Sequence, residues 1–197
     1  MRNSSKILIA FALLLSLSLN AAALEQKSMS RYSSECAEAS WSEVVGNRTI
    51  NTQISVTEEN DQTGVYFSTS TWGPNYYFYK SGSTYTRDDV FKMSKNLDSA
   101  SLSEIEVEAY YYSYDEMGGY ASGTETLRIK ADWTGVGELN ERSSKYSVED
   151  GDYTSKVSES YLSRGAKATG SINGINLGDS SYAWLSSLTS TSTSMKK

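Results

Sequence analysis

The sequence predicts an all-β chain, an antiparallel β-sandwich or partly open barrel of about eight to ten strands. Two observations predict this class. Segments in which apolar and polar residues alternate recur along the chain, as expected of strands with one buried face. Turn signals separate these segments roughly every ten residues, and the 197-residue chain contains a single proline.

The N-terminus has the features of a Sec-type signal peptide, which we expect to be cleaved. Arg2 and Lys6 precede an apolar run at 7–19, and three alanines follow at 21–23. The run is shorter than the roughly 20 residues that span a bilayer, so no stable membrane anchor is expected. We therefore predict a signal peptide at 1–23 and a secreted protein, located outside the cell or at its surface.

The rest of the chain predicts one β domain with a polar segment at each end. Residues 24–42 are rich in Ser, Glu and Ala, which indicates a leader segment or a short helix. The β domain is expected to cover 43–188. The Ser/Thr-rich residues 189–197 are expected to be a disordered tail.

In the first half of the domain, alternation predicts strands at 50–57 and 65–72, joined as a hairpin through a polar loop. Gly73-Pro74-Asn75 ends the second strand, and a third is expected at 76–79. The segment 87–97 is ambiguous between a short helix and a strand edge around Phe91 and Met93, of which the strand is favoured.

The clearest pattern is a long hairpin between Ser103 and Trp133. Its odd-numbered residues are mostly apolar on both strands, and its even-numbered residues are mostly polar or tyrosine. Folding through 115–122 is expected to place Ile105 opposite Trp133 and Glu108 opposite Lys130. A shift by one residue would expose every apolar side chain, so the pattern constrains the register.

Further hairpins are expected toward the C-terminus. The second strand of the central hairpin should continue through 134–139, with a bulge or bend at its glycines. Asp150-Gly151 and Asn173-Gly174 are typical two-residue hairpin turns. Residues 182–188 are expected to form an edge strand or a helical turn.

Composition excludes several classes of chemistry. The chain has no histidine, which removes His-dependent general bases, nucleophile triads and His-ligated metals. Its one cysteine, Cys36, cannot form an internal disulfide; a free thiol is favoured over a link to another chain. With a net charge of −6, nucleic acid is not an expected partner. No cofactor is predicted, and Asn47-Arg48-Thr49 fits the N-glycosylation pattern.

Carboxylates offer the one enzymatic alternative. Glu106 and Glu108 are expected on one face of a strand about 7 Å apart, within the range used by inverting glycosidases. Cross-strand ion pairs with Arg128 and Lys130 explain these residues more simply. The acidic clusters at 58–61 and 149–152 suit calcium, but solvated turns are favoured, so no metal site is predicted.

Aromatic residues are the main candidates for a binding site. Three tyrosines of the central hairpin are predicted to point away from the core, and further rings near strand ends are expected beside them: Tyr110, Tyr112 and Tyr114, with Trp72, Tyr76, Phe78 and Tyr120. Exposed rings favour a partner, since tyrosine offers amphipathic contact area. Coverage by a second sheet, or simple cross-strand pairing, are the alternatives.

These features predict an exported, non-catalytic binding or structural protein that recognises extracellular polysaccharide or protein through a Tyr-rich strand face. One alternative is an enzyme that uses carboxylates on an extracellular polymer. Another is a membrane-inserting β-toxin, because amphipathic Ser/Thr-rich strands can form barrels.

Overall fold

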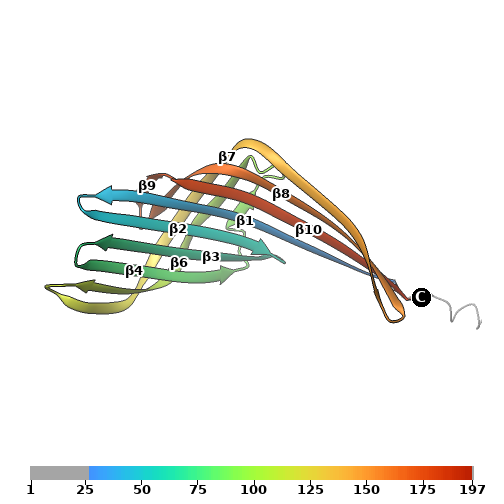
Figure 1. Cartoon of the computed structure of the whole chain (residues 1–197), viewed down its shortest axis with the longest axis horizontal. Helices are drawn as coiled ribbons and strands as arrows, with labels where there is room; N and C mark the ends of the chain where they lie inside the picture. The colour runs from blue at the N-terminus through green and yellow to red at the C-terminus, as the bar shows by residue number, and fades with distance from the viewer. Residues whose placement is uncertain (1–26, 197) are drawn as a thin grey trace, which may run out of the picture. The chain divides into compact units, whose positions relative to one another are not determined.

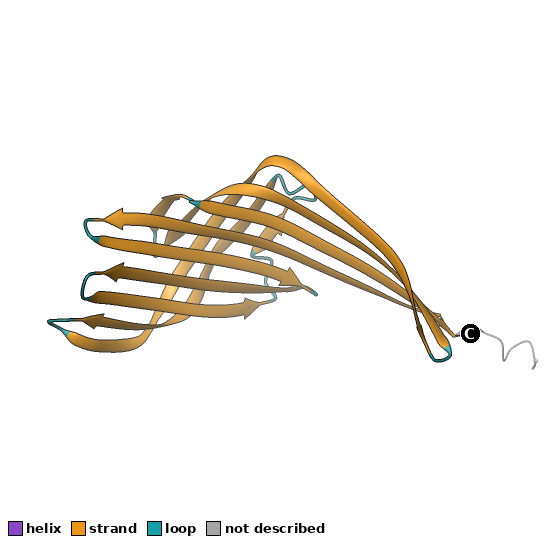
Figure 2. Cartoon of the chain, in the orientation of Figure 1, coloured by secondary structure: helices purple, strands orange, loops and turns teal. Residues whose placement is uncertain are grey.

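A computed structural model describes residues 27–196, which form ten β-strands and contain no helix (Figures 1 and 2). The predicted signal peptide at 1–23 lies outside the described residues. Within residues 27–196, no helix has the length and apolar character needed to cross a membrane. The strands are β1 (Lys27–Val45), β2 (Arg48–Glu59), β3 (Gln62–Gly73), β4 (Tyr76–Thr86), β5 (Phe91–Met93), β6 (Ser99–Asp115), β7 (Gly119–Asp150), β8 (Tyr153–Ile172), β9 (Ile175–Asp179) and β10 (Tyr182–Lys196).

All ten strands belong to one sheet. Its order is β10-β1-β2-β3-β4-β6-β7-β8-β9, with β5 paired to β6. An additional pairing joins β10 to β8, so the order of neighbours closes on itself. The predicted all-β, antiparallel class is confirmed.

The chain divides into two compact units. The larger contains residues 31–144 and 159–190. The smaller contains, among the described residues, 27–30, 145–158 and 191–196. Within the smaller unit the hydroxyl groups of Ser155 and Ser194 share a hydrogen bond.

The sheet extends further in sequence than the predicted domain, and two expectations are corrected. Residues 27–42, expected as a leader or short helix, belong to β1, and residues 189–196, expected as a disordered tail, belong to β10. In β1 the inward positions Ala37 and Ala39 are buried. Alanine is common in helices and depleted in strands, so this alternation gave little sign of a strand.

The core follows from the period-2 pattern. Alternate residues of each central strand are buried, which is expected when one face of a strand packs inside and the other meets solvent. Among its largest fully buried side chains are Trp133, Phe67, Ile54, Leu102, Leu127 and Ile129.

The central hairpin has the predicted faces but a different register. Val107 and Ile129 are buried, whereas Glu108 and Lys130 are exposed. Ile105 pairs with Ile129, not with Trp133. The loop is shorter than expected: β6 ends at Asp115 and β7 begins at Gly119. From Ile105 to Asp115 the shift in register is even, so these side chains keep their predicted face although their partners differ. A bulge between Leu102 and Ile105 then changes the register by one residue, and Trp133 pairs with Ala100.

Turn residues set most of the strand boundaries. Asn173 and Gly174 have φ of 50° and 77°, as the predicted Asn-Gly hairpin turn requires. Asn60 and Asp61, at 51° and 60°, make the β2–β3 turn as tight as this one, where a longer loop was expected. The β7–β8 turn falls at Gly151-Asp152, one residue later than predicted.

Candidate binding site

Four aromatic residues form a continuous row across four neighbouring strands. Trp72 of β3 is the register partner of Tyr77 of β4, and Tyr77 is the partner of Tyr114 of β6. Tyr114 in turn pairs with Tyr120 of β7. We call these four residues the aromatic row. It lies next to the β3–β4 and β6–β7 turns, which are at the same end of the sheet (Figure 1).

The aromatic row lies on the outward face of the sheet. On β6 the odd-numbered Val107 and Ala109 are fully buried, so the even-numbered tyrosines point the other way. Exposed fractions agree for three of the four: 54% for Trp72, 36% for Tyr114 and 85% for Tyr120, while Tyr77 is partly buried between its neighbours. The rings are accessible to a partner.

The rings of the row form two contacting pairs, one at each end of the row. The ring centroids of Trp72 and Tyr77 are 4.3 Å apart in an edge-to-face arrangement, and those of Tyr114 and Tyr120 are 4.9 Å apart. Aromatic pairs at such separations contribute about 0.5–1.5 kcal/mol beyond the area they bury. These contacts hold the exposed rings in place before any ligand arrives.

A second row of tyrosines lies directly beside the first. Tyr79 of β4 is the register partner of Tyr112 of β6, with ring centroids 5.8 Å apart. Tyr112 also links the two rows, because its ring lies 5.2 Å from that of Tyr77 and their hydroxyl groups share a hydrogen bond of 3.0 Å. Tyr110 of β6 occupies the next outward position after Tyr112. The residues of both rows and Tyr110 form a surface that we call the aromatic face: Trp72, Tyr77, Tyr79, Tyr110, Tyr112, Tyr114 and Tyr120.

Hydrogen bonds between hydroxyl groups also shift the proton affinities of the aromatic face. The bond with Tyr112 raises the pKa of Tyr77 to about 12, and desolvation adds to the effect. Beside the face, a hydrogen bond to Tyr79 raises the pKa of Tyr66, with 3.4 Å between the hydroxyl oxygens. Hydrogen bonds from Ser81 and Tyr66 lower the pKa of Tyr79. Tyrosine hydroxyls are protonated near neutral pH, so the face carries no charge there.

The structure brings together four of the five predicted site residues: Tyr110, Tyr112, Tyr114 and Trp72. Tyr76 is separated from them. It pairs with Asp115, one position along from the Tyr77–Tyr114 pair, so its side chain points to the other face of the sheet. There its ring lies 3.8 Å from the guanidinium carbon of Arg48.

Sequence reasoning missed Tyr77 and Tyr79. The segment 76–79 is aromatic at every position, so no polar residue indicated which side chains point outward. Only the pairing of β4 with β6, which the structure provides, shows that Tyr77 and Tyr79 lie beside Tyr114 and Tyr112.

On the opposite face of the same strands, an ion pair takes the place of apolar packing. Lys80 of β4 and Glu125 of β7 approach to 2.5 Å across β6, and the lysine side chain is 15% exposed. Its ammonium group lies 5.5 Å from the ring centroid of Phe78 and 5.8 Å from that of Tyr111. This cluster gives the half-buried lysine both a counter-charge and two aromatic neighbours.

The carboxylate pair considered for catalysis is on the exposed surface. Glu106 forms an ion pair with Arg128 at 3.4 Å, and both side chains are more than 60% exposed. Glu108 is opposite Thr126, not the expected Lys130. The Glu106–Arg128 contact is a cross-strand ion pair of the predicted kind, formed in a register that differs from the predicted one. Within the described residues, no group of three Cys, Asp or Glu side chains is arranged to hold a metal ion.

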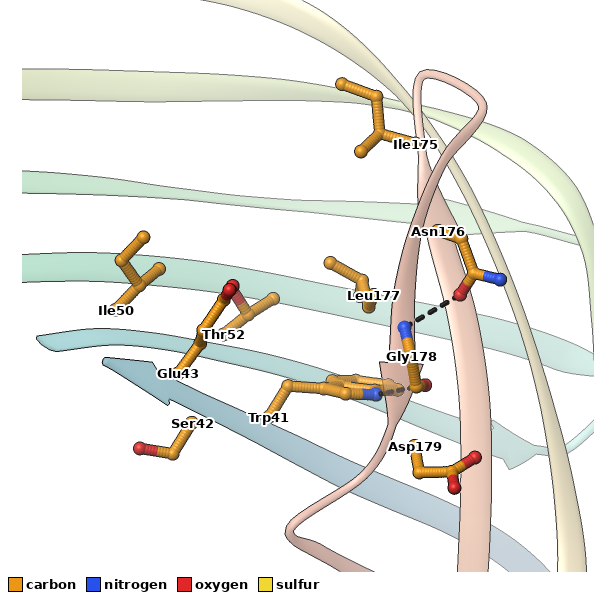
Figure 3. Close-up of a pocket in the computed structure, with 10 residues that line it drawn as sticks. All are labelled: Trp41, Ser42, Glu43, Ile50, Thr52, Ile175, Asn176, Leu177, Gly178 and Asp179. Carbon is orange, nitrogen blue, oxygen red and sulfur yellow. Dashed lines mark hydrogen bonds between the residues drawn. The ribbon is translucent and has the colours of Figure 1, made fainter. Parts of the chain in front are cut away.

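A pocket of about 420 Å³ lies where β9 approaches β1 and β2 (Figure 3). The indole nitrogen of Trp41 donates a hydrogen bond of 3.0 Å to the carbonyl oxygen of Gly178, and the Gly178 amide donates one of 2.7 Å to Asn176. The first bond links β9 to β1, and the second lies within β9. The lining residues are Trp41, Ser42, Glu43, Ile50, Thr52, Ile175, Asn176, Leu177, Gly178 and Asp179.

Comparison of the chain with protein-family models and with curated proteins finds no match. Among solved structures, two mutants of a porin from Rh. blastica and a chain described as "Asymmetric conductivity of engineered proteins" align at 8% identity. Each alignment covers 86% of this chain and 100% of the other, with TM-scores of 0.11 to 0.12. Scores this low carry no information about fold or function.

Proposed function

We propose that this protein is an exported, non-catalytic binding protein that recognises extracellular polysaccharide or protein through the aromatic face. Export is proposed from the signal sequence at 1–23. The binding role is proposed from the structure of the outward surface.

One observation carries the proposal: exposed aromatic rings lie in register across four strands, on the side of the sheet away from the core. Cross-strand aromatic pairs stabilise a sheet, but rings exposed side by side over several strands also present a continuous apolar area to solvent, which is uncommon on a surface without a partner. Exposed aromatic patches of this kind commonly mark interaction sites. Ring contacts and hydroxyl hydrogen bonds already fix the geometry, which lowers the entropic penalty of binding.

The test is a binding screen on immobilised glycans and on extracellular material from the source organism. We expect the full-length mature protein to be retained by at least one of them. Replacing Trp72 and Tyr114 by Ala should lower the affinity by about tenfold or more, because aromatic side chains dominate interfaces of this kind. The melting temperature should fall by only about 2–10 °C, because both side chains are exposed and the replacements remove two aromatic pairs but no core packing.

Tyr85→Ala is the matched control, because Tyr85 is on β4 like Tyr77 and Tyr79 and is 71% exposed, yet lies outside the aromatic face. Its binding should equal that of the parent protein. Retention that is unaffected by the Trp72 and Tyr114 replacements would contradict the proposal.

A further inference from the structure

We infer that the ligand of the aromatic face is an uncharged polysaccharide. This inference rests on the proposed function and narrows it to one class of ligand. It depends on which residues surround the aromatic rings, and on the residue types that are missing from that area.

The aromatic face lies within a field of outward positions that contains no charged residue. Three consecutive register rows cross β1, β2, β3, β4, β6 and β7, and each row has six outward members. The first is Val44, Thr49, Trp72, Tyr77, Tyr114 and Tyr120; the second is Ser42, Asn51, Ser70, Tyr79, Tyr112 and Ser122; the third is Ser40, Gln53, Ser68, Ser81, Tyr110 and Thr124. We call these three rows the uncharged field.

The absence of charge is specific to this area. Charged residues make up 21% of the chain, and the net charge is −6. The next outward positions on β1 and β6 are already charged, since they are Glu38 and Glu108. None of the residues of the uncharged field is buried, so core packing does not account for their composition.

This composition fits a neutral, hydroxyl-rich ligand. Aromatic rings offer flat apolar area to the C–H faces of a sugar, while Ser, Thr, Asn, Gln and tyrosine hydroxyls donate and accept hydrogen bonds. An anionic or cationic polymer would lose hydration here without gaining a counter-charge. A protein partner gains register and specificity from complementary charges, which this field does not supply.

The dimensions favour a polymer over a single sugar. The aromatic row crosses three inter-strand spacings, so its four rings span about 14 Å. A ligand that contacts all of them must be extended across the strands, as a chain of several sugar units is.

The experiment compares soluble uncharged polysaccharides (a β-glucan, a galactomannan and a xylan) with anionic ones (alginate and polygalacturonate) by affinity electrophoresis and calorimetry. We expect at least one uncharged polysaccharide to bind the mature protein. Its Kd should change by less than about twofold between about 50 mM and about 500 mM NaCl, because no ion pair is screened. Trp72→Ala should weaken binding by about tenfold or more.

Tyr120→Ala is a second variant in case Trp72→Ala does not fold, because Tyr120 is 85% exposed. Tyr85→Ala again serves as the control and should bind as the parent does. Binding to an anionic polysaccharide or to a protein that is lost in Trp72→Ala would overturn the inference and leave the proposed function standing. If no ligand of any class depends on Trp72 or Tyr120, both are overturned.

Discussion

The hydrogen bond between Tyr77 and Tyr112 is the closest coupling within the aromatic face. It joins the two rows of rings, and together with desolvation the contact with Tyr112 raises the pKa of Tyr77 to about 12. A raised pKa means that the contribution of Tyr77 to stability is fully present below its ordinary pKa of 10. The contribution is lost as the pH rises through the folded-state value.

This coupling predicts a distinct step in an alkaline titration followed by ultraviolet absorbance. The difference between the parent protein and Tyr77→Phe should show one phenol ionising near pH 12. Tyr112→Phe should move that step down toward 10, because the hydrogen bond is then absent. A Tyr77 step near 10 in the parent protein would show that the two hydroxyl groups are not coupled.

At the residue scale, sequence alone predicted orientation wherever apolar and polar residues alternate. Tyr110, Tyr112 and Tyr114 could be assigned to the outward face because their neighbours Val107 and Ala109 are apolar. Tyr77 could not be assigned, since the strand around it is aromatic on both faces. Its orientation depends on the strand it pairs with.

At the element scale, the spacing of β4 and β6 depends on a glycine. A Cβ atom at Gly82 would lie 2.3 Å from the carbonyl oxygen of Glu108 and 2.9 Å from the Cα of Ala109. Both atoms belong to the backbone of β6, so neither can move without separating the two strands. These strands carry Tyr77, Tyr79, Tyr112 and Tyr114, so the glycine also sets the geometry of the aromatic face.

Gly82→Ala should therefore lower the free energy of unfolding by about 1–3 kcal/mol, as is typical when a methyl group is forced into a well-packed site. Chemical denaturation followed by circular dichroism measures the change. Gly118→Ala is the control, because a Cβ there would make only an ordinary contact of 3.7 Å with the Cβ of Asp115. Equal stability of the two variants would show that β4 and β6 are not packed this closely.

Element types were more predictable than their ends and partners. β2 and β6 could be predicted because branched apolar residues alternate with polar ones. β1 and β10 carry alanine, serine and threonine over much of their length, and such residues leave the choice between strand, helix and coil to tertiary pairing. The register of the central hairpin depended on a loop length that the sequence pattern does not determine.

At the scale of the whole molecule, the strand order was not predictable. The sheet closes because β10 pairs with both β1 and β8, and β1 is at the opposite end of the described residues from β8 and β10. Alternation says which face of a strand is buried but not which strand lies next to it. The uncharged field follows from that order, since six strands must be neighbours before its three rows exist.

The central claim is that the aromatic row faces solvent in the free protein and is covered by the ligand. Hydroxyl-radical footprinting with mass spectrometry tests it most directly, using the mature protein alone and with the uncharged polysaccharide that binds it best. We predict strong oxidation of Trp72 and Tyr120 in the free protein, protection of both on binding, and little oxidation of the buried Trp133 in either state. Oxidation of Trp133 at the level of Trp72, or no protection of Trp72 and Tyr120 by a bound polysaccharide, would contradict the claim.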